Sequence, residues 1–172
     1  YYKFDDPNMF ESDIPRETRV LTDLYLNEDN PSTGHKVIFF DIEVSMENGI
    51  PNIENPNNEV TAITLYDSVT KEYTVLVLDK TGSRQNYKKG DIDTYFFKDE
   101  LDLLYKFVDV YEAIGPTIIT GWNSDYFDVP YLYNRLKQQC GNGIANRLSP
   151  IGKLKYSKFR KKWMIAGVSS LD

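Results

Sequence analysis

The chain has 172 residues, 14% of them aromatic, with 20 basic and 26 acidic side chains and a net charge of −6. This length suits one domain with a sizeable core, and the aromatic content excludes an intrinsically disordered chain. A single cysteine excludes an intrachain disulfide framework, and no apolar run approaches the about 18 residues of a membrane-spanning helix. We therefore expect a soluble globular domain without an export signal and without a membrane partner.

The charge is unevenly distributed along the chain. Residues 1–128 carry 11 Lys and Arg against 25 Asp and Glu, whereas residues 129–171 carry nine Lys and Arg and no acid. Such a basic run can bind phosphates, or it can be a solvated loop, and the sequence leaves both interpretations open. Its densest part consists of Lys153, Lys155, Lys158, Arg160, Lys161 and Lys162.

Apolar periodicity and turn residues predict the following elements in chain order. Residues 1–35 are polar and rich in turn formers, and we interpret them as a lead-in segment with one short strand at Arg19–Leu26. Strands at 60–66 and 73–78 are separated by a short turn, which predicts an antiparallel hairpin. The other predicted elements are strands at 36–44, 117–120 and 163–169, helices at 99–114 and 129–139, and loops at 45–58, 81–93 and 149–162. Together they predict an α/β domain around a mixed sheet.

The predicted strand at 36–44 runs from four apolar residues directly into Asp41-Ile42-Glu43. Side chains two residues apart in a strand share a face, so Asp41 and Glu43 are expected to project together, with Phe40, Ile42 and Val44 on the other side. Two neighbouring carboxylates repel each other unless a proton or a cation lies between them, and Mg²⁺ or Mn²⁺ prefers such oxygen ligands. The alternative is a strand end that places two acids in solvent.

Asp128 follows a predicted strand and loop and opens the second predicted helix, with Pro130 in the first turn. Its carboxylate is therefore a candidate for a second acidic position near the first pair. The alternative is a helix cap, in which the carboxylate accepts hydrogen bonds from free backbone N–H groups.

Taken together, these motifs resemble a known family. Asp41-Ile42-Glu43 and Asn123-x-x-x-Phe127-Asp128 are similar to the first two exonuclease motifs of family B DNA polymerases. The opening 10–14 with Arg19 resembles the lead-in to that domain in the wider family. Longer stretches resemble the T-even-type phage polymerases in particular, namely residues 62–68, 120–135, 147–152 and 167–172.

The resemblance implies a ribonuclease-H-like (DnaQ-like) fold, a mixed sheet flanked by helices, and 3′→5′ proofreading exonuclease function. It implies two Mg²⁺ or Mn²⁺ ions, with Asp41 bridging them, Glu43 on the nucleophile-side ion and Asp128 on the other. Asn123 and Phe127 are implied to position the strand terminus or the loop itself. The implied partners are the 3′ end of single-stranded DNA and the remainder of a polymerase chain, and a phage-like protein would act in the cytoplasm of a bacterial host.

The sequence departs from the family at the third motif, Tyr-x-x-x-Asp, which is expected after Asp128. That pattern occurs six times here, and every occurrence precedes Asp128. We therefore expect a lead-in segment at 1–35 and an exonuclease domain at 36–172 that is truncated before its third motif. We also expect the isolated chain to have little or no nuclease activity.

Two other functions remain open from the sequence. One is a stand-alone DnaQ-like exonuclease. The other is a non-catalytic nucleic-acid-binding module of the same fold, although intact Asp41, Glu43 and Asp128 favour a working site.

Overall fold

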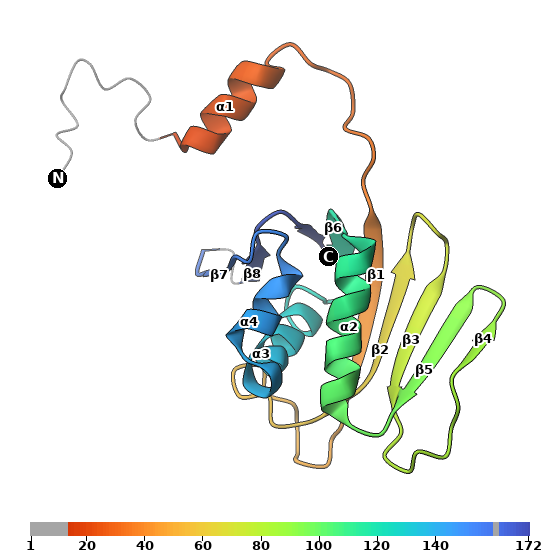
Figure 1. Cartoon of the computed structure of the whole chain (residues 1–172). Coiled ribbons are helices and arrows are strands. Elements are labelled where there is room, and N and C mark those ends of the chain that lie inside the picture. The colour runs from red at the N-terminus through yellow and green to blue at the C-terminus, as the bar shows by residue number, and fades with distance from the viewer. Residues whose placement is uncertain (1–13, 160–161) are drawn as a thin grey trace. The chain divides into compact units, whose positions relative to one another are not determined.

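The computed structural model describes residues 14–159 and 162–172. The chain forms two compact units, residues 1–33 and residues 34–172 (Figure 1). The described part of the first unit contains the helix α1 (Arg16–Tyr25), and every residue of this helix is exposed. Part of the sequence that resembles the family lead-in, residues 10–13, lies outside the described residues.

The strand predicted at Arg19–Leu26 is wrong, because this segment belongs to α1 and the turn that follows it. Pro15 precedes the first helical residue with φ −55°, which suits a helix start, where no intrahelical N–H donor is needed. Val20, Leu21 and Leu24 also fit one face of a helix, with spacings of one and three residues. The alternation that suggested a strand was too short to distinguish the two periods.

The second unit is built on a seven-stranded mixed sheet with the order β4-β5-β3-β2-β1-β6-β9. The central strand β1 pairs antiparallel with β2 and parallel with β6, and β6 pairs parallel with β9. The mixed sheet and the predicted β2–β3 hairpin are therefore confirmed. The strands are β1 (Val37–Val44), β2 (Val60–Asp67), β3 (Tyr73–Leu78), β4 (Tyr87–Lys89), β5 (Ile92–Phe97), β6 (Ile118–Thr120) and β9 (Ser169–Leu171).

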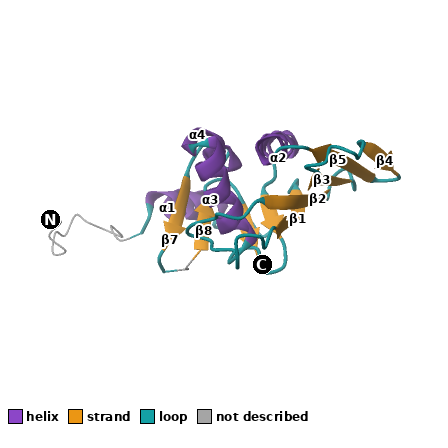
Figure 2. Cartoon of the chain, turned by 90° about the horizontal axis from the view of Figure 1, so that it is seen from below, coloured by secondary structure: helices purple, strands orange, loops and turns teal. Residues whose placement is uncertain are grey.

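The long helix α2 (Glu100–Ile114) packs on β2, β3 and β5, and Figure 2 shows it on one side of the sheet. The Asp99 carboxylate accepts a hydrogen bond from Leu101 N at 2.6 Å and caps its start, and Gly115 ends it at φ 60°. Helix α3 (Asp128–Cys140) packs beside α2 and is followed by α4 (Asn142–Ala145) and the short 3₁₀ helix η1 (Asn146–Leu148). Both predicted long helices are thus confirmed.

Three predicted loop or strand boundaries are wrong. The charged segment predicted as a loop at 81–93 contains β4 and the first residues of β5, and the loop predicted at 149–162 contains β7 (Leu154–Ser157). All residues of β4 are exposed, as in an edge strand, so the segment lacks the apolar alternation that marks a strand. The strand predicted at 163–169 is two strands, β8 (Lys162–Ile165) and β9, because Gly167 turns the chain between them with φ 90°.

The core lies between the sheet and the helices. Ile38, Phe40 and Ile42 of β1 are buried there, together with residues of α2 and α3 such as Phe107 and Leu132. The opposite face of β1 carries exposed residues, so the central strand presents one face to the core and the other to solvent.

Candidate active site

Asp41 and Glu43 lie on the exposed face of β1, and Phe40 and Ile42 are buried on the other face. The predicted division of this strand into an acidic and an apolar face is therefore confirmed. Both acids belong to the last four residues of the strand, beyond the segment that pairs with β6.

The edge of β1 is only partly covered by its parallel neighbour. The three residues of β6 pair with Val37, Ile38 and Phe39, and the chain then turns away at Gly121. Farther along β1, the N–H of Ile42 donates a hydrogen bond to Asp128 Oδ1 at 2.9 Å. Because β6 is short, the end of β1 has no parallel neighbour among the described residues, and the Asp128 carboxylate accepts the hydrogen bond that a neighbouring strand would otherwise accept.

The loop from Gly121 to Phe127 brings Asp128 to this edge. It passes so close to β1 that a Cβ atom on Gly121 would lie 2.5 Å from the carbonyl oxygen of Phe40. Asn123 has a left-handed backbone (φ 56°), and its carbonyl accepts hydrogen bonds from the N–H groups of Tyr126 and Phe127. Asparagine tolerates this conformation better than most residues. The loop is therefore a tight turn that ends where α3 begins.

Asp128 is 4% exposed, and its pKa is raised to about 6. Burial is the main cause, and the negative charges of Asp41 and Asp172 add to it, whereas the hydrogen bond from Ile42 opposes it. The helix-cap alternative is wrong, since Phe127 occupies the cap position and the carboxylate of Asp128 reaches across to β1.

Comparison with known proteins identifies the family. A model of the exonuclease domain of family B DNA polymerases matches residues 6–171. The chain belongs to this family. It is 30% identical over 164 residues to the DNA-directed DNA polymerase of Escherichia phage RB69, and 31% identical over 159 residues to that of Enterobacteria phage T4. These alignments cover 80% and 77% of the chain but only 18% of each phage protein.

The fold agrees with this assignment. The family B DNA polymerase of the archaeon Pyrobaculum calidifontis superposes with a TM-score of 0.61 and 25% sequence identity, over 84% of this chain and 16% of that one. The predicted ribonuclease-H-like α/β fold is therefore confirmed, as is the resemblance to phage polymerases.

The exonuclease domain has carboxylate oxygens suited to a hard divalent cation, but they do not form a complete coordination site. Within residues 14–159 and 162–172, no group of three or more His, Cys, Asp or Glu side chains is arranged to hold a metal ion. Burial is the main cause of the raised pKa of Asp128, and the repulsion by Asp41 and Asp172 that adds to it is a condition that a bound cation relieves. Carboxylates are also the ligands that Mg²⁺ and Mn²⁺ prefer, so the donor chemistry fits.

Asp172 is a neighbour of this site that the sequence did not single out. It follows β9, and its Oδ2 accepts a hydrogen bond from Asp125 N at 3.4 Å. Its charge contributes to the raised pKa of Asp128. Only the parallel pairing of β6 with β9 brings it here, and no local sequence pattern encodes that pairing.

The two predicted positioning residues differ in their surroundings. Asn123 is exposed in the turn, whereas Phe127 is partly buried and stacks on Tyr131 with ring centroids 5.5 Å apart. Phe127 therefore helps to fix the start of α3. A role of either residue in holding DNA stays a prediction.

Part of the basic run is engaged in internal ion pairs. Arg135 pairs with Glu100, Arg147 with Glu112 and Asp109, and Lys162 with Asp125. Lys153, Lys155 and Lys158 are exposed near the β7–β8 hairpin. Some cations of the basic run therefore stabilise the fold through ion pairs, whereas others face solvent, where they could bind phosphates.

A groove of about 550 Å³ lies next to the loop that carries Asp125 and Tyr126. One wall is the β1–β2 connection, and another is the β7–β8 hairpin. Its apolar and aromatic lining includes Pro51, Ile53, Tyr126, Pro130, Tyr156 and Trp163. A second cavity, of about 470 Å³, adjoins the end of α2 and contains none of the predicted site residues.

Replacing Asp128 by Asn is expected to stabilise the metal-free exonuclease domain near neutral pH. The folded pKa of about 6 lies above the ordinary value of 3.8, so the folded state binds more protons between these values and loses stability as the pH rises. The variant keeps an acceptor for Ile42 N–H without the buried charge. We expect a gain of roughly 1–3 kcal/mol at pH 7, measured by urea unfolding with a chelator. The gain in unfolding free energy should vanish at about pH 4. An equal gain at pH 4 and pH 7 would contradict this account.

The close approach of Gly121 to β1 gives a second prediction. In Gly121→Ala the new methyl group meets the Phe40 carbonyl, which is backbone and cannot move aside cheaply. We expect a loss of roughly 1–3 kcal/mol in the free energy of unfolding. Gly143→Ala is the matched control, since nothing lies within 4 Å of the position that its methyl group would take. Equal stability of the two variants would contradict the close contact.

Proposed function

We propose that this chain is the 3′→5′ proofreading exonuclease part of a family B DNA-directed DNA polymerase, and that it hydrolyses the 3′-terminal phosphodiester of single-stranded DNA. The observation that carries the proposal is the hydrogen bond between Ile42 N–H and the Asp128 carboxylate. It ties Asp128 to the peptide between Asp41 and Glu43, as expected if the three acids serve one site.

Asp41, Glu43 and Asp128 are the residues that would hold two Mg²⁺ or Mn²⁺ ions. When bound, a pair of such ions supplies a hydroxide nucleophile and neutralises charge on the phosphate and the leaving oxygen. The chain's own contribution is placement. β1 fixes Asp41 and Glu43 on one face, and Ile42 N–H orients Asp128 by donating to its Oδ1.

Exposed aromatic side chains beside the acids support a single-stranded substrate. Trp122 is 92% exposed and Tyr126 is 55% exposed, and Tyr126 also lines the groove of about 550 Å³. Aromatic rings stack on any base, and this tolerance of sequence suits proofreading, which must accept every terminal nucleotide. The exposed lysines near β7 add attraction for phosphates.

We also propose that the domain works within a larger polymerase chain, with residues 1–35 leading into it and residues 36–172 forming the exonuclease domain. The chain spans about 18% of the length of the two phage polymerases, which supports this context. A phage polymerase of this kind would act in the cytoplasm of its bacterial host. The described residues contain no helix long and apolar enough to cross a membrane.

The metal assignment is tested by Asp41→Ala in the 172-residue chain. Mn²⁺ binding by calorimetry is the primary measurement, and hydrolysis is the second. We expect Asp41→Ala to lower Mn²⁺ affinity at least about tenfold and to remove any residual cleavage of 3′-labelled single-stranded DNA.

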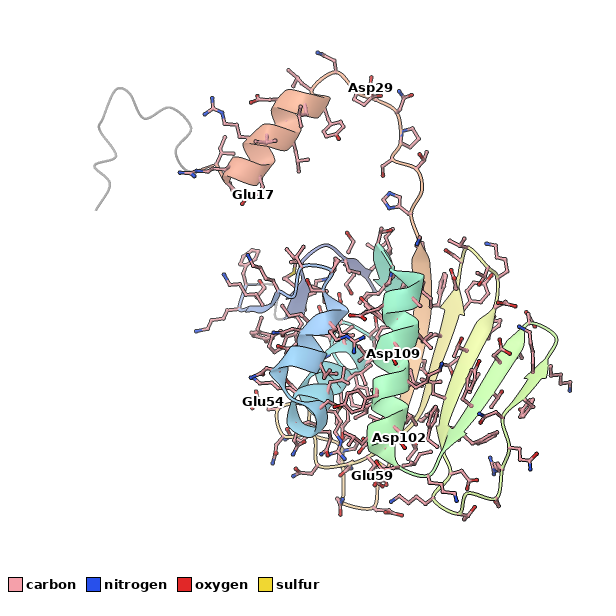
Figure 3. The ribbon with its side chains drawn as sticks, in the orientation of Figure 1. Glu17, Asp29, Glu54, Glu59, Asp102 and Asp109 are labelled. Atoms are coloured by element: carbon pink, nitrogen blue, oxygen red, sulfur yellow. The ribbon has the colours of Figure 1, made fainter. Side chains whose placement is uncertain are left out.

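Asp102→Ala is the matched control for this experiment. Figure 3 labels Asp102 on α2, where it is exposed, together with Asp109. Its removal should leave Mn²⁺ affinity within about twofold of the original. Mn²⁺ binding that survives Asp41→Ala unchanged would refute the assignment, and so would rapid metal-dependent cleavage by Asp41→Ala.

The proposed path of the DNA strand is tested by Tyr126→Ala. Loss of one stacking surface should weaken binding of a short single-stranded oligonucleotide roughly tenfold, as measured by fluorescence anisotropy in Ca²⁺ buffer. Tyr105→Ala removes a ring of the same size from α2, where Tyr105 is 38% exposed, and should change the affinity less than about twofold. Equal effects of the two substitutions would count against the groove as the binding path.

A further inference from the structure

The strand β2 contains an irregularity opposite the end of β1. Glu43 pairs with Ala62, and Val44 pairs with Val60, so Thr61 is an extra residue in the ladder. The extra residue changes which side chains face the core. Ile63 and Leu65 are buried at alternate positions, and the shift makes Val60 the next buried residue in place of Thr61. Such bulges bend a strand and redirect the side chains beside it.

A buried ion pair holds this bulge from the helical side of the sheet. The N–H of Val60 donates to Glu100 Oε1 at 2.8 Å. Arg135 donates to both oxygens of the same carboxylate, from Nε at 2.9 Å and from Nη2 at 2.6 Å. Glu100 is 8% exposed and Arg135 is 5% exposed, so the pair lies in the core. The backbone N–H at the bulge therefore has a charged acceptor that is itself fixed by a two-point contact.

Helix α3 connects this ion pair to the candidate active site. Asp128 in its first turn contacts β1 through Ile42, and Arg135, two turns later, contacts the start of β2 through Glu100. Arg135 Nη1 also donates to the carbonyl of Pro56 at 2.7 Å, and Tyr131 donates to that of Asn58 at 2.7 Å. One rigid helix thus positions Asp128 and also fixes the chain that returns from Glu43.

The pair has no clear advantage for stability alone. Replacing a buried ion pair by apolar residues of similar size is often neutral or stabilising, because the charges are costly to desolvate. What an apolar pair cannot supply is an acceptor for Val60 N–H. The geometry of the bulge is therefore the property that depends on Glu100.

We propose that Glu100 is a positioning residue for Glu43: by accepting the Val60 N–H it fixes the bulge that aims the Glu43 carboxylate at the cation site, while Arg135 compensates the buried charge of Glu100. This inference rests on the proposed function, in which Glu43 is a metal ligand. It predicts that the orientation of Glu43 depends on an acceptor oxygen at position 100 and does not depend on the charges of the pair.

Two double variants separate the acceptor from the charge. Glu100→Leu with Arg135→Met removes both, whereas Glu100→Gln with Arg135→Met removes the charges and keeps an acceptor oxygen for Val60. Three quantities are measured in each folded protein: the NMR shift of the Glu43 amide, hydrogen exchange at the Val60 amide, and Mn²⁺ affinity. Asn134→Ala is the control on the same helix, since Asn134 contacts the Ile53 carbonyl and not the bulge.

We expect the Leu–Met variant to shift the Glu43 amide signal, to lose protection at Val60 and to bind Mn²⁺ about tenfold more weakly. The Gln–Met variant should restore all three, and Asn134→Ala should leave Mn²⁺ affinity within about twofold of the original. A folded Leu–Met variant with an unchanged Glu43 signal and unchanged Mn²⁺ affinity would overturn the proposal.

If the Leu–Met variant does not fold, the Gln–Met variant decides the question by itself. Weak Mn²⁺ binding with Val60 still protected would overturn the proposal, whereas normal binding with a protected Val60 would support it. Failure of the proposed function is distinguishable, because it appears as Mn²⁺ binding in the original chain that Asp41→Ala does not affect. The Glu43 and Val60 amides still test the positioning role in that event.

Discussion

The hydrogen bond from Ile42 N–H to Asp128 joins two segments 86 residues apart, and the candidate site depends on it. It exists because β6 ends after three residues and leaves the edge of β1 uncovered beyond Phe39. In a longer parallel pair, this N–H would donate to a neighbouring strand. Here the Asp128 carboxylate accepts the hydrogen bond instead. Helix α3, which begins at Asp128, is thereby joined to β1 where the pairing with β6 has ended.

This arrangement has an energetic cost that the rest of the domain offsets. Asp128 is buried near other acids, and its raised pKa is a measure of how unfavourable the charge is there. The surrounding structure holds it in place through the core packing of α3 and the close passage of Gly121 over β1. Under the proposed function, a bound cation would relieve the repulsion among these charges. Through Arg135 the same helix also contacts Glu100, which accepts the Val60 N–H at the bulge beside Glu43.

The basic run shows why the number of charges in a segment does not by itself predict a charged surface. Nine cations without an acid in residues 129–171 suggested a phosphate-binding face. The fold brings acids from distant segments to three of them: Glu100 to Arg135, Glu112 to Arg147 and Asp125 to Lys162. Such pairings depend on tertiary contacts and leave no trace in local composition.

The sequence by itself determined the elements whose signal is local. The alternation in β1 separated Asp41 from its apolar neighbours, the spacing of apolar residues defined α2, and the motifs indicated the polymerase family. Only the tertiary structure decided that Asp128 bonds to β1 instead of capping α3, and that Asp172 approaches Asp128. The physical reason is that periodicity records which face of an element is buried, whereas partners across the sheet are set by strand order, strand length and register.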